Sequence, residues 1–363
     1  RTDMSFMFSG MKGLTAVEPG PDWDTTNVTD MSGMFSNIGT FTGDFSSWNT
    51  SNVTDMSYMF ELSGGSTFPV TGLSSWNTTN VTNMQSMFSY VRLNEDISSW
   101  DVSNVTDMGR MFLRTSNADP NISNWDVGNV KNMGEMFSET SVFNGNISGW
   151  NTSNVTDMRY MFSNAQAFNS DISNWDVGNV TNMYEMFRNA YVFNGDISNW
   201  NVGNVTTLNK MFYYAKAFNS DISNWNVGNV TNMSNMFYEG WSFNSNISGW
   251  NTSNVTDMSN MFRYTNVFHQ DLSGWNTSNV TDMRYMFSNA KSFYGNIEGW
   301  NTSNVTNMYS MLRYARLFNR DLSGWCVTKI GSRPTNFSNS SGMPTNGSFD
   351  PKWGTCPRGE DQA

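Results

Sequence analysis

Tryptophan recurs every 25 residues over most of this 363-residue chain. The spacing is constant from Trp100 to Trp325, and Trp23, Trp48 and Trp76 extend the series with spacings of 25, 28 and 24. Each tryptophan begins nearly the same unit, seen in WNTSNVTDMRYMFSNAQAFNSDISN from residue 150 to residue 174. A fixed period of this size is the signature of one supersecondary unit stacked many times. We therefore predict a solenoid of about 13 coils.

The repeat divides the chain into three regions. Residues 1–22 are a partial N-terminal repeat, because RTDMSFMF matches the VTDMxxMF part of the unit. Residues 23–325 form the solenoid. Residues 326–363 are polar and hold four of the eight prolines, so we predict an irregular C-terminal cap over the last coil.

Within one unit the apolar residues have two different periods. Val155, Met158, Phe162 and Ala165 are spaced by three or four residues, as on one face of a helix, and polar capping residues precede them. The segment 171–175 alternates between polar and apolar residues, which is typical of a strand. Each coil is therefore predicted to hold one short helix and one short strand, an α/β solenoid.

Eight side chains in each coil form the predicted core. In the unit that starts at residue 150 they are Trp150, Val155, Met158, Met161, Phe162, Ala165, Phe168 and Ile172. Ordering a whole coil costs more free energy than burying these side chains returns, so a single coil cannot fold alone. Stability must come from stacking, in which neighbouring coils share their apolar layers.

The two cysteines, Cys326 and Cys356, both lie in the non-repetitive C-terminal segment. Their position at the edges of the predicted cap favours a disulfide bond, with two unrelated free thiols as the alternative. A structural disulfide implies an oxidising compartment, so we expect an extracellular or cell-surface protein.

Composition excludes several classes of function. The net charge is −11 and only 14% of residues are charged, so the chain lacks the basic stripe of a nucleic-acid-binding protein. No run of 18 apolar residues is present that could span a membrane. A single histidine, His269, and the absence of catalytic or phosphate-binding motifs argue against an enzyme.

Arginine, tyrosine and tryptophan recur on the predicted outer face of the helical segment. These are the residue types of binding hot spots, although solvent-facing side chains that drifted freely are the alternative. The candidate interaction face comprises Arg159, Tyr160, Arg188, Tyr213, Tyr214, Tyr238, Trp241, Arg263, Tyr264, Arg284, Tyr285, Arg313 and Tyr314.

Two polar rows suggest further sites. Asp171, Asp196 and Asp221 occupy equivalent places in successive coils and could hold Ca²⁺, but each could instead bond the backbone of its own turn. No other cofactor is predicted. A threonine row, seen in Thr206 and Thr231, suggests ice binding, but capping of the predicted helices explains it equally well.

The unit W-[ND]-x-x-NVT-[DN]-M-x-x-MF-x-x-A-x-x-FN-x-[DN]-[IL]-S resembles the 25-residue repeat of BspA-like leucine-rich-repeat surface proteins. The closing segment from Trp325 to Pro357 is similar to the end of such arrays, and the resemblance covers residues 23–357. It implies a leucine-rich-repeat-like solenoid, secretion, and a part in surface adhesion or binding to the extracellular matrix. It implies no catalytic residues.

Two functions follow from these patterns. The first is a non-enzymatic extracellular scaffold that displays the Arg/Tyr face to a protein, a glycan or the extracellular matrix. The second is a structural subunit that assembles with copies of itself into a filament or surface layer, and ice binding is the weaker third possibility.

Overall fold

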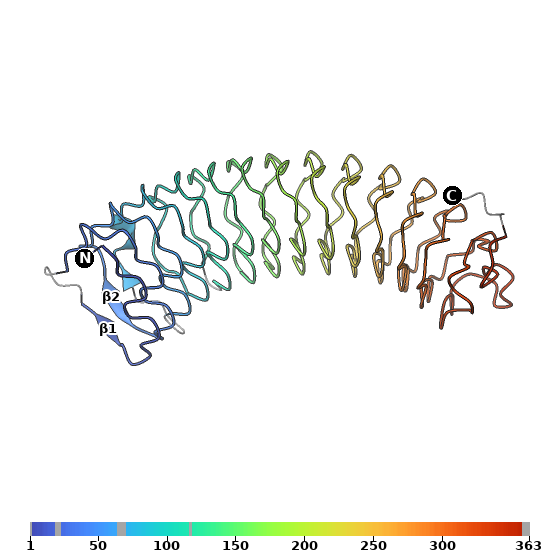
Figure 1. Cartoon of the computed structure of the whole chain (residues 1–363), viewed down its shortest axis with the longest axis horizontal. Helices are drawn as coiled ribbons and strands as arrows, with labels where there is room; N and C mark the ends of the chain where they lie inside the picture. The colour runs from blue at the N-terminus through green and yellow to red at the C-terminus, as the bar shows by residue number, and fades with distance from the viewer. Residues whose placement is uncertain (1, 19–22, 64–69, 116–117, 358–363) are drawn as a thin grey trace. The chain divides into compact units, whose positions relative to one another are not determined.

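The computed structural model describes residues 2–18, 23–63, 70–115 and 118–357. The chain divides into two compact units, Arg1–Asn179 and Val180–Ala363. Within each unit, successive coils of the chain lie side by side and stack on one another (Figure 1). The repeat solenoid that the tryptophan period predicts is therefore confirmed.

Regular secondary structure is sparse in the described part of the chain. Three short parallel strands, β1 (Ala16–Val17), β2 (Thr42–Asp44) and β3 (Val70–Thr71), form one sheet in the order β1-β2-β3. One 3₁₀ turn, η1 (Leu73–Ser75), follows β3. In later coils the only β-pairing is a single bridged residue per coil, as between Asp257 and Asp282.

The predicted helix of each coil is wrong, and so is the predicted strand over residues 171–175. The backbone after residue 157 forms successive turns, and residues 173 and 174 form a turn as well. The fold is therefore a solenoid of turns rather than an α/β solenoid.

Backbone hydrogen bonds alternate between two destinations along the turn segment. Met133 and Glu135 donate their N–H groups to Asp157 and Arg159 of the next coil at 3.0 and 2.9 Å. The intervening Met136 donates to the carbonyl of Met133 within its own coil at 3.2 Å. In a helix these amides would donate hydrogen bonds within the segment, whereas here half of them donate to carbonyls of neighbouring coils.

Each turn segment also holds two residues with a positive φ, four positions apart. In the coil from residue 225 they are Asn235 (φ 58°) and Glu239 (φ 52°), and in the coil from residue 275 they are Tyr285 (φ 55°) and Asn289 (φ 61°). This left-handed region costs most residues energy, and asparagine tolerates it better than others. The hydrogen bonds between coils hold these residues in place.

Asn235 tests this backbone geometry directly. We expect Asn235→Gly to leave stability unchanged or slightly raised, because glycine adopts positive φ freely, and Asn235→Ala to cost about 1–2 kcal/mol. In a helix the order would reverse, since glycine there costs about 1 kcal/mol relative to alanine. Urea unfolding of the two variants decides between the geometries.

The predicted core is confirmed coil by coil. All eight side chains predicted for the coil from residue 150 are buried, Trp150 at 3% exposure and the other seven at 0%. Phenylalanines of adjacent coils stack in ladders, as Phe237 on Phe262 at 5.7 Å between ring centroids. The tryptophans stack in the same way, and Trp250 lies 6.5 Å from Trp225 with the rings 3° apart.

The core tryptophans also link coils through their indole nitrogens. Trp250 donates from Nε1 to the carbonyl of Ile222 at 3.1 Å, and Trp275 donates to Ile247 at 3.0 Å. The threonine row makes a parallel ladder: both the amide and the hydroxyl of Thr256 donate to the carbonyl of Thr231, at 2.8 and 3.2 Å. These threonines therefore join coils, and the prediction that they cap helices is wrong.

The C-terminal segment departs from the irregular cap that we predicted. Ser310, Leu312 and Tyr314 donate to the carbonyls of Thr335, Phe337 and Asn339, the same alternating bonds that join other coils. Positive φ recurs at residues 336 and 340, and Phe337 is fully buried. One further coil therefore follows Trp325. The sequence hides it because Arg333 and Asn336 stand where other coils carry the two methionines.

Cys326 and Cys356 form a disulfide bond. Beside it the end of the described chain returns to the last coil, where Val327 donates to Thr355 and Gly354 donates to Ile330, both at 2.9 Å. Trp353 packs edge-on against Phe337 at 5.0 Å, so its ring covers part of the last apolar layer.

Candidate interaction surface

The candidate residues of the second unit gather into a cluster of tyrosines and arginines on the turn segments. Tyr213 stacks on Tyr238 of the next coil at 4.7 Å, with 16° between the rings. Tyr214 lies 4.8 Å from Tyr213 and 5.5 Å from Tyr238. Tyr264 meets Tyr238 edge-on at 5.8 Å. The coil repeat brings these rings together because the same turn position recurs in each coil.

Arg263 lies among the rings of three coils. Its guanidinium carbon is 4.1 Å from the ring centroid of Tyr285, 5.3 Å from that of Tyr264 and 5.7 Å from that of Tyr238. Cation–π attraction of this kind contributes about 0.5–1 kcal/mol at a partly exposed site. The arginine therefore fixes the orientation of the surrounding phenols. We call the set Tyr213, Tyr214, Tyr238, Arg263, Tyr264 and Tyr285 the tyrosine–arginine cluster.

A buried carboxylate anchors the edge of this cluster. Glu185 is 2% exposed and accepts from Arg188 at 2.9 Å and from Lys210 at 3.0 Å. Arg188 in turn lies 5.7 Å from the ring of Tyr213. Burial acts against ionisation of Glu185, but the hydrogen bonds from Lys210 and Arg188 outweigh it and lower the pKa of this carboxyl. The glutamate therefore holds both cations at neutral pH.

We expect the contribution of Glu185 to stability to depend on pH. Because its folded pKa lies below the unfolded value of 4.5, the contribution is present above pH 4.5 and is lost as the pH falls through the lower folded value. Glu185→Gln should cost about 1–2 kcal/mol at pH 7. Urea unfolding between pH 7 and pH 3 should show the two proteins converging in acid, and a constant difference would contradict this assignment.

Four phenols of the cluster, those of Tyr213, Tyr214, Tyr238 and Tyr285, stay neutral at physiological pH. Burial raises the pKa of Tyr213, Tyr238 and Tyr285 above the ordinary value of 10.0. Burial and the neighbouring Glu239 raise the pKa of Tyr214 further. The surface therefore offers neutral hydroxyl groups and aromatic edges beside permanent positive charge, which suits hydrogen bonding to a polar or anionic partner.

The remaining candidate residues make their closest contacts outside the cluster, although the charge of Arg313 is felt by Tyr285. Arg313 covers only Tyr314, at 4.8 Å, and Arg284 pairs with Asp282 at 3.3 Å. Trp241 lies under the ammonium group of Lys216 at 4.2 Å. In the first unit, Arg159 pairs with Asp157 at 2.9 Å, and Tyr160 occupies a positive-φ position.

Sequence reasoning missed four residues that complete the surface. They are Tyr184, Glu185, Lys210 and Tyr309. Lys210 lies 5.8 Å from the ring of Tyr184, and Tyr309 packs edge-on against Tyr285 at 5.1 Å. All four lie nine or ten residues after a tryptophan, as Arg284 and Tyr285 do, so alignment of the repeats would have identified them.

The aspartates of the row bond the backbone of their own turns, which was the alternative to Ca²⁺ binding. The carboxylates of Asp171, Asp196 and Asp221 accept the backbone amides of Ser173, Ser198 and Ser223 at 2.9, 3.0 and 2.9 Å. Within the described residues, no group of three or more His, Cys, Asp and Glu side chains lies close enough to hold a metal ion. The same residues contain no helix that is long and apolar enough to cross a membrane.

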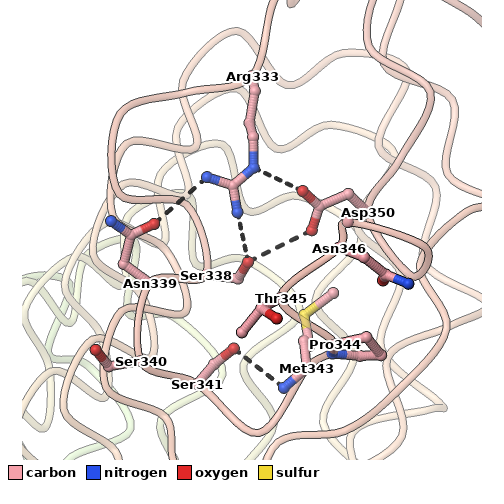
Figure 2. Close-up of a pocket in the computed structure, with 11 residues that line it drawn as sticks. Arg333, Ser338, Asn339, Ser340, Ser341, Met343, Pro344, Thr345, Asn346 and Asp350 are labelled. Atoms are coloured by element: carbon pink, nitrogen blue, oxygen red, sulfur yellow. Dashed lines mark hydrogen bonds and ion pairs between the residues drawn. The ribbon is translucent and has the colours of Figure 1, made fainter.

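A polar pocket of about 550 Å³ lies in the C-terminal region (Figure 2). Arg333 crosses it and donates to Asp350 at 2.6 Å and to Ser338 at 2.7 Å. Asn339 accepts a longer bond from the same guanidinium at 3.4 Å. Asp350 is 9% exposed, so this network joins the last coil to the segment that follows it. The arginine is fully engaged in holding these two parts together.

Comparisons with known proteins identify a family for the chain but no curated relative. The search of curated proteins gave no significant match. One similar solved structure, described as "Crystal structure of TLR13-ssRNA13 complex", is 10% identical with a TM-score of 0.23 and covers 90% of this chain. The chain spans about half, 51%, of that structure, and a TM-score this low supports no conclusion about fold or ligand. A family model described as "Mycoplasma protein of unknown function, DUF285" matches five overlapping stretches, 2–92, 62–175, 143–250, 168–272 and 233–349. Since these stretches together span nearly the whole sequence, the chain belongs to the DUF285 family.

Proposed function

We propose that this protein is a non-enzymatic extracellular scaffold that binds a protein or glycan partner through the tyrosine–arginine cluster. The observation that carries the proposal is the clustering of five tyrosines from four successive coils, and three of these tyrosines surround Arg263. Tyrosine and arginine dominate binding hot spots because they present a large contact area and hydrogen bonds with little loss of rotamer freedom. The resemblance to BspA-like leucine-rich-repeat surface proteins supports the same role.

The disulfide bond supports an extracellular or surface location. Disulfides persist in oxidising environments and are rare where thiols are kept reduced. The bond between Cys326 and Cys356 lies at the end of the coil stack, where it restrains the chain rather than reacting with a substrate.

Self-assembly into a filament or layer is the second candidate, and the distribution of charge favours it. Residues 1–179 hold seven Lys and Arg against nineteen Asp and Glu, whereas residues 180–363 hold thirteen against twelve. An acidic unit and a near-neutral unit with cationic patches can attract one another between copies in a head-to-tail contact, which propagates rather than closes. Analytical ultracentrifugation at low and high salt tests this, since such contacts weaken with salt.

We expect the triple variant Tyr213→Ser, Tyr238→Ser and Arg263→Ser to bind its protein or glycan partner at least about tenfold more weakly, because it removes the centre of the cluster. None of these positions has a positive φ, so the backbone is undisturbed. Adhesion of the full chain to immobilised matrix proteins and glycans is the measurement.

The control replaces Tyr58, Tyr90 and Arg114 of the first unit with Asn, because all three positions have a positive φ, which asparagine tolerates. There Arg114 lies 5.0 Å from the ring of Tyr90, outside any larger cluster. Equal adhesion by both variants and the unmodified chain would overturn the proposed function, and a loss of sedimenting assemblies instead of adhesion would favour the filament.

A further inference from the structure

A second row of side chains runs beside the tyrosine–arginine cluster in residues 180–325. It consists of the sixteenth residue after each tryptophan: Tyr191, Lys216, Trp241, Asn266, Lys291 and Arg316. Aromatic and cationic side chains occupy five of its six places. We call it the position-16 row.

Backbone hydrogen bonds between coils keep this row in register. In four steps of the row, the residue after one member donates to the carbonyl of the preceding member: Ala217 to Tyr191 at 3.2 Å, Ser242 to Lys216 at 3.1 Å, Ser292 to Asn266 at 3.2 Å and Leu317 to Lys291 at 3.3 Å. The row is therefore a rigid track with one side chain per coil.

Trp241, Lys291 and Arg316 of the row are exposed, the other three members are half-buried, and both aromatic members lie beside a cation. The ammonium group of Lys216 lies 5.0 Å from the ring centroid of Tyr191 and 4.2 Å from that of Trp241. Trp241 remains 49% exposed, whereas the core tryptophan Trp250 is 2% exposed. Val192 and Leu317, which flank the row, are 46% and 57% exposed. Such a surface offers aromatic rings and exposed apolar side chains for contact with a partner.

Several cations in the described part of the second unit lack a carboxylate partner, whereas Arg188, Lys210 and Arg284 have one. Within residues 180–357, no ion pair involves Lys216, Arg263, Lys291, Arg313, Arg316 or Arg320. In the first unit, the turn-segment cations Arg110, Arg114 and Arg159 pair with Glu135, Glu139 and Asp157. In a chain of net charge −11, the three cations of the position-16 row, Lys216, Lys291 and Arg316, thus have no ion pair among the described residues.

We propose that the position-16 row binds a linear acidic polysaccharide that lies along the stack of coils. This inference rests on the proposed function and names the class of its partner. Carboxylate or sulfate groups of the glycan would pair with Lys216, Lys291 and Arg316, and the C–H faces of its sugar rings would pack on Trp241 and Tyr191. A periodic polyanion fits a track that offers one contact per coil, as a globular protein would not.

Nucleic acid is the other periodic polyanion, and the structure favours the glycan over it. Binding of single strands depends on bases stacking on open aromatic faces. Here Tyr191 and Trp241 are separated by the cationic Lys216, and no aromatic residue stands at the other four places in the row, so the row has no run of adjacent rings. The track therefore offers few platforms for successive bases, while its charge remains suited to acidic sugars.

The test measures binding of the full chain to heparin and to polygalacturonate, with neutral dextran and poly(U) as comparison polymers. We expect salt-sensitive binding to the two acidic polysaccharides, none to dextran, and weaker binding to poly(U). The variant Lys216→Gln, Lys291→Gln and Arg316→Gln should bind about tenfold more weakly with a shallower salt dependence. Trp241→Ala should weaken binding with the salt dependence unchanged.

The matched control is Arg110→Gln, Arg114→Gln and Arg159→Gln, which changes net charge by the same amount in the first unit. It should bind acidic polysaccharide as the unmodified chain does. Equal losses in both triple variants, or unchanged binding in the position-16 variant, would overturn the proposal, and tighter row-dependent binding of poly(U) would assign the row to nucleic acid. If the chain does not bind acidic polysaccharides but its adhesion still depends on Tyr213 and Tyr238, this inference is wrong and the proposed function stands.

Discussion

Trp250→Ala should lower the free energy of unfolding by about 3–5 kcal/mol. The side chain is 2% exposed, stacks on Trp225 and Trp275 at 6.5 and 6.3 Å, and donates from Nε1 to Ile222. Alanine leaves a cavity between two coils and removes the indole hydrogen bond to the carbonyl of Ile222, which adds to the lost burial. Urea unfolding followed by far-UV circular dichroism measures the change.

The control is Trp241→Ala, which removes the same side chain from the surface. Trp241 is 49% exposed and touches Lys216, so its loss should cost about 1 kcal/mol or less. Similar costs for the two tryptophans would mean that the ladder of stacked indoles does not stabilise the coils.

The repeat and its core could be predicted from the sequence because packing repeats with the chain. Every coil needs the same apolar layer, so Val155, Met158, Phe162 and Phe168 had to return at fixed intervals. The spacing of these residues misled us about the backbone. Successive turns that close at three residues bring apolar side chains to one side at nearly the same intervals as a helix does. Periodicity alone therefore cannot separate the two structures.

A clue to the turns was present in the sequence. Asn164, Asn189, Asn235, Asn260 and Asn289 all stand ten or fourteen residues after a tryptophan, and all have positive φ. Asparagine is enriched in that region of backbone space and is a weak helix former. Tyrosine and glutamate occupy the same places in other coils, which obscured the pattern. The cost of positive φ at these places is offset because the residues donate their own amides to the adjacent coil, as Asn235 does to Ser259 and Asn289 to Arg313.

The residue types of the candidate surface were predicted from the sequence, but the contacts between their side chains were not. Arginine and tyrosine were selected because they are typical of binding hot spots, and Tyr213, Tyr238 and Arg263 do lie in one cluster. Arg159 and Tyr160 belong to the first unit, and Arg284 is held by Asp282. Which side chains touch depends on the register between coils, and this register follows from hydrogen bonds that a helix would not make.

Loss of the disulfide should destabilise the C-terminal end selectively. In the chain-entropy model, a bond between residues 30 apart contributes about 3–4 kcal/mol. The double variant Cys326→Ser and Cys356→Ser should therefore free the segment around Trp353 and expose Phe337, whose coil has no methionine at its two usual positions. Hydrogen exchange should accelerate at Val327, whose amide bonds to Thr355 beside the disulfide.

Amides of interior coils supply the internal control for this experiment. The stability of a solenoid is approximately the sum of the stabilities of its single coils and of the interfaces between neighbouring coils. Fraying at one end therefore need not spread through the stack. Exchange at Thr231 and Thr256, within the threonine ladder, should stay as slow as in the unmodified protein. Uniformly faster exchange would show that the disulfide stabilises the whole unit. Unchanged exchange at Val327 would show that the Arg333–Asp350 network holds the end without the covalent bond.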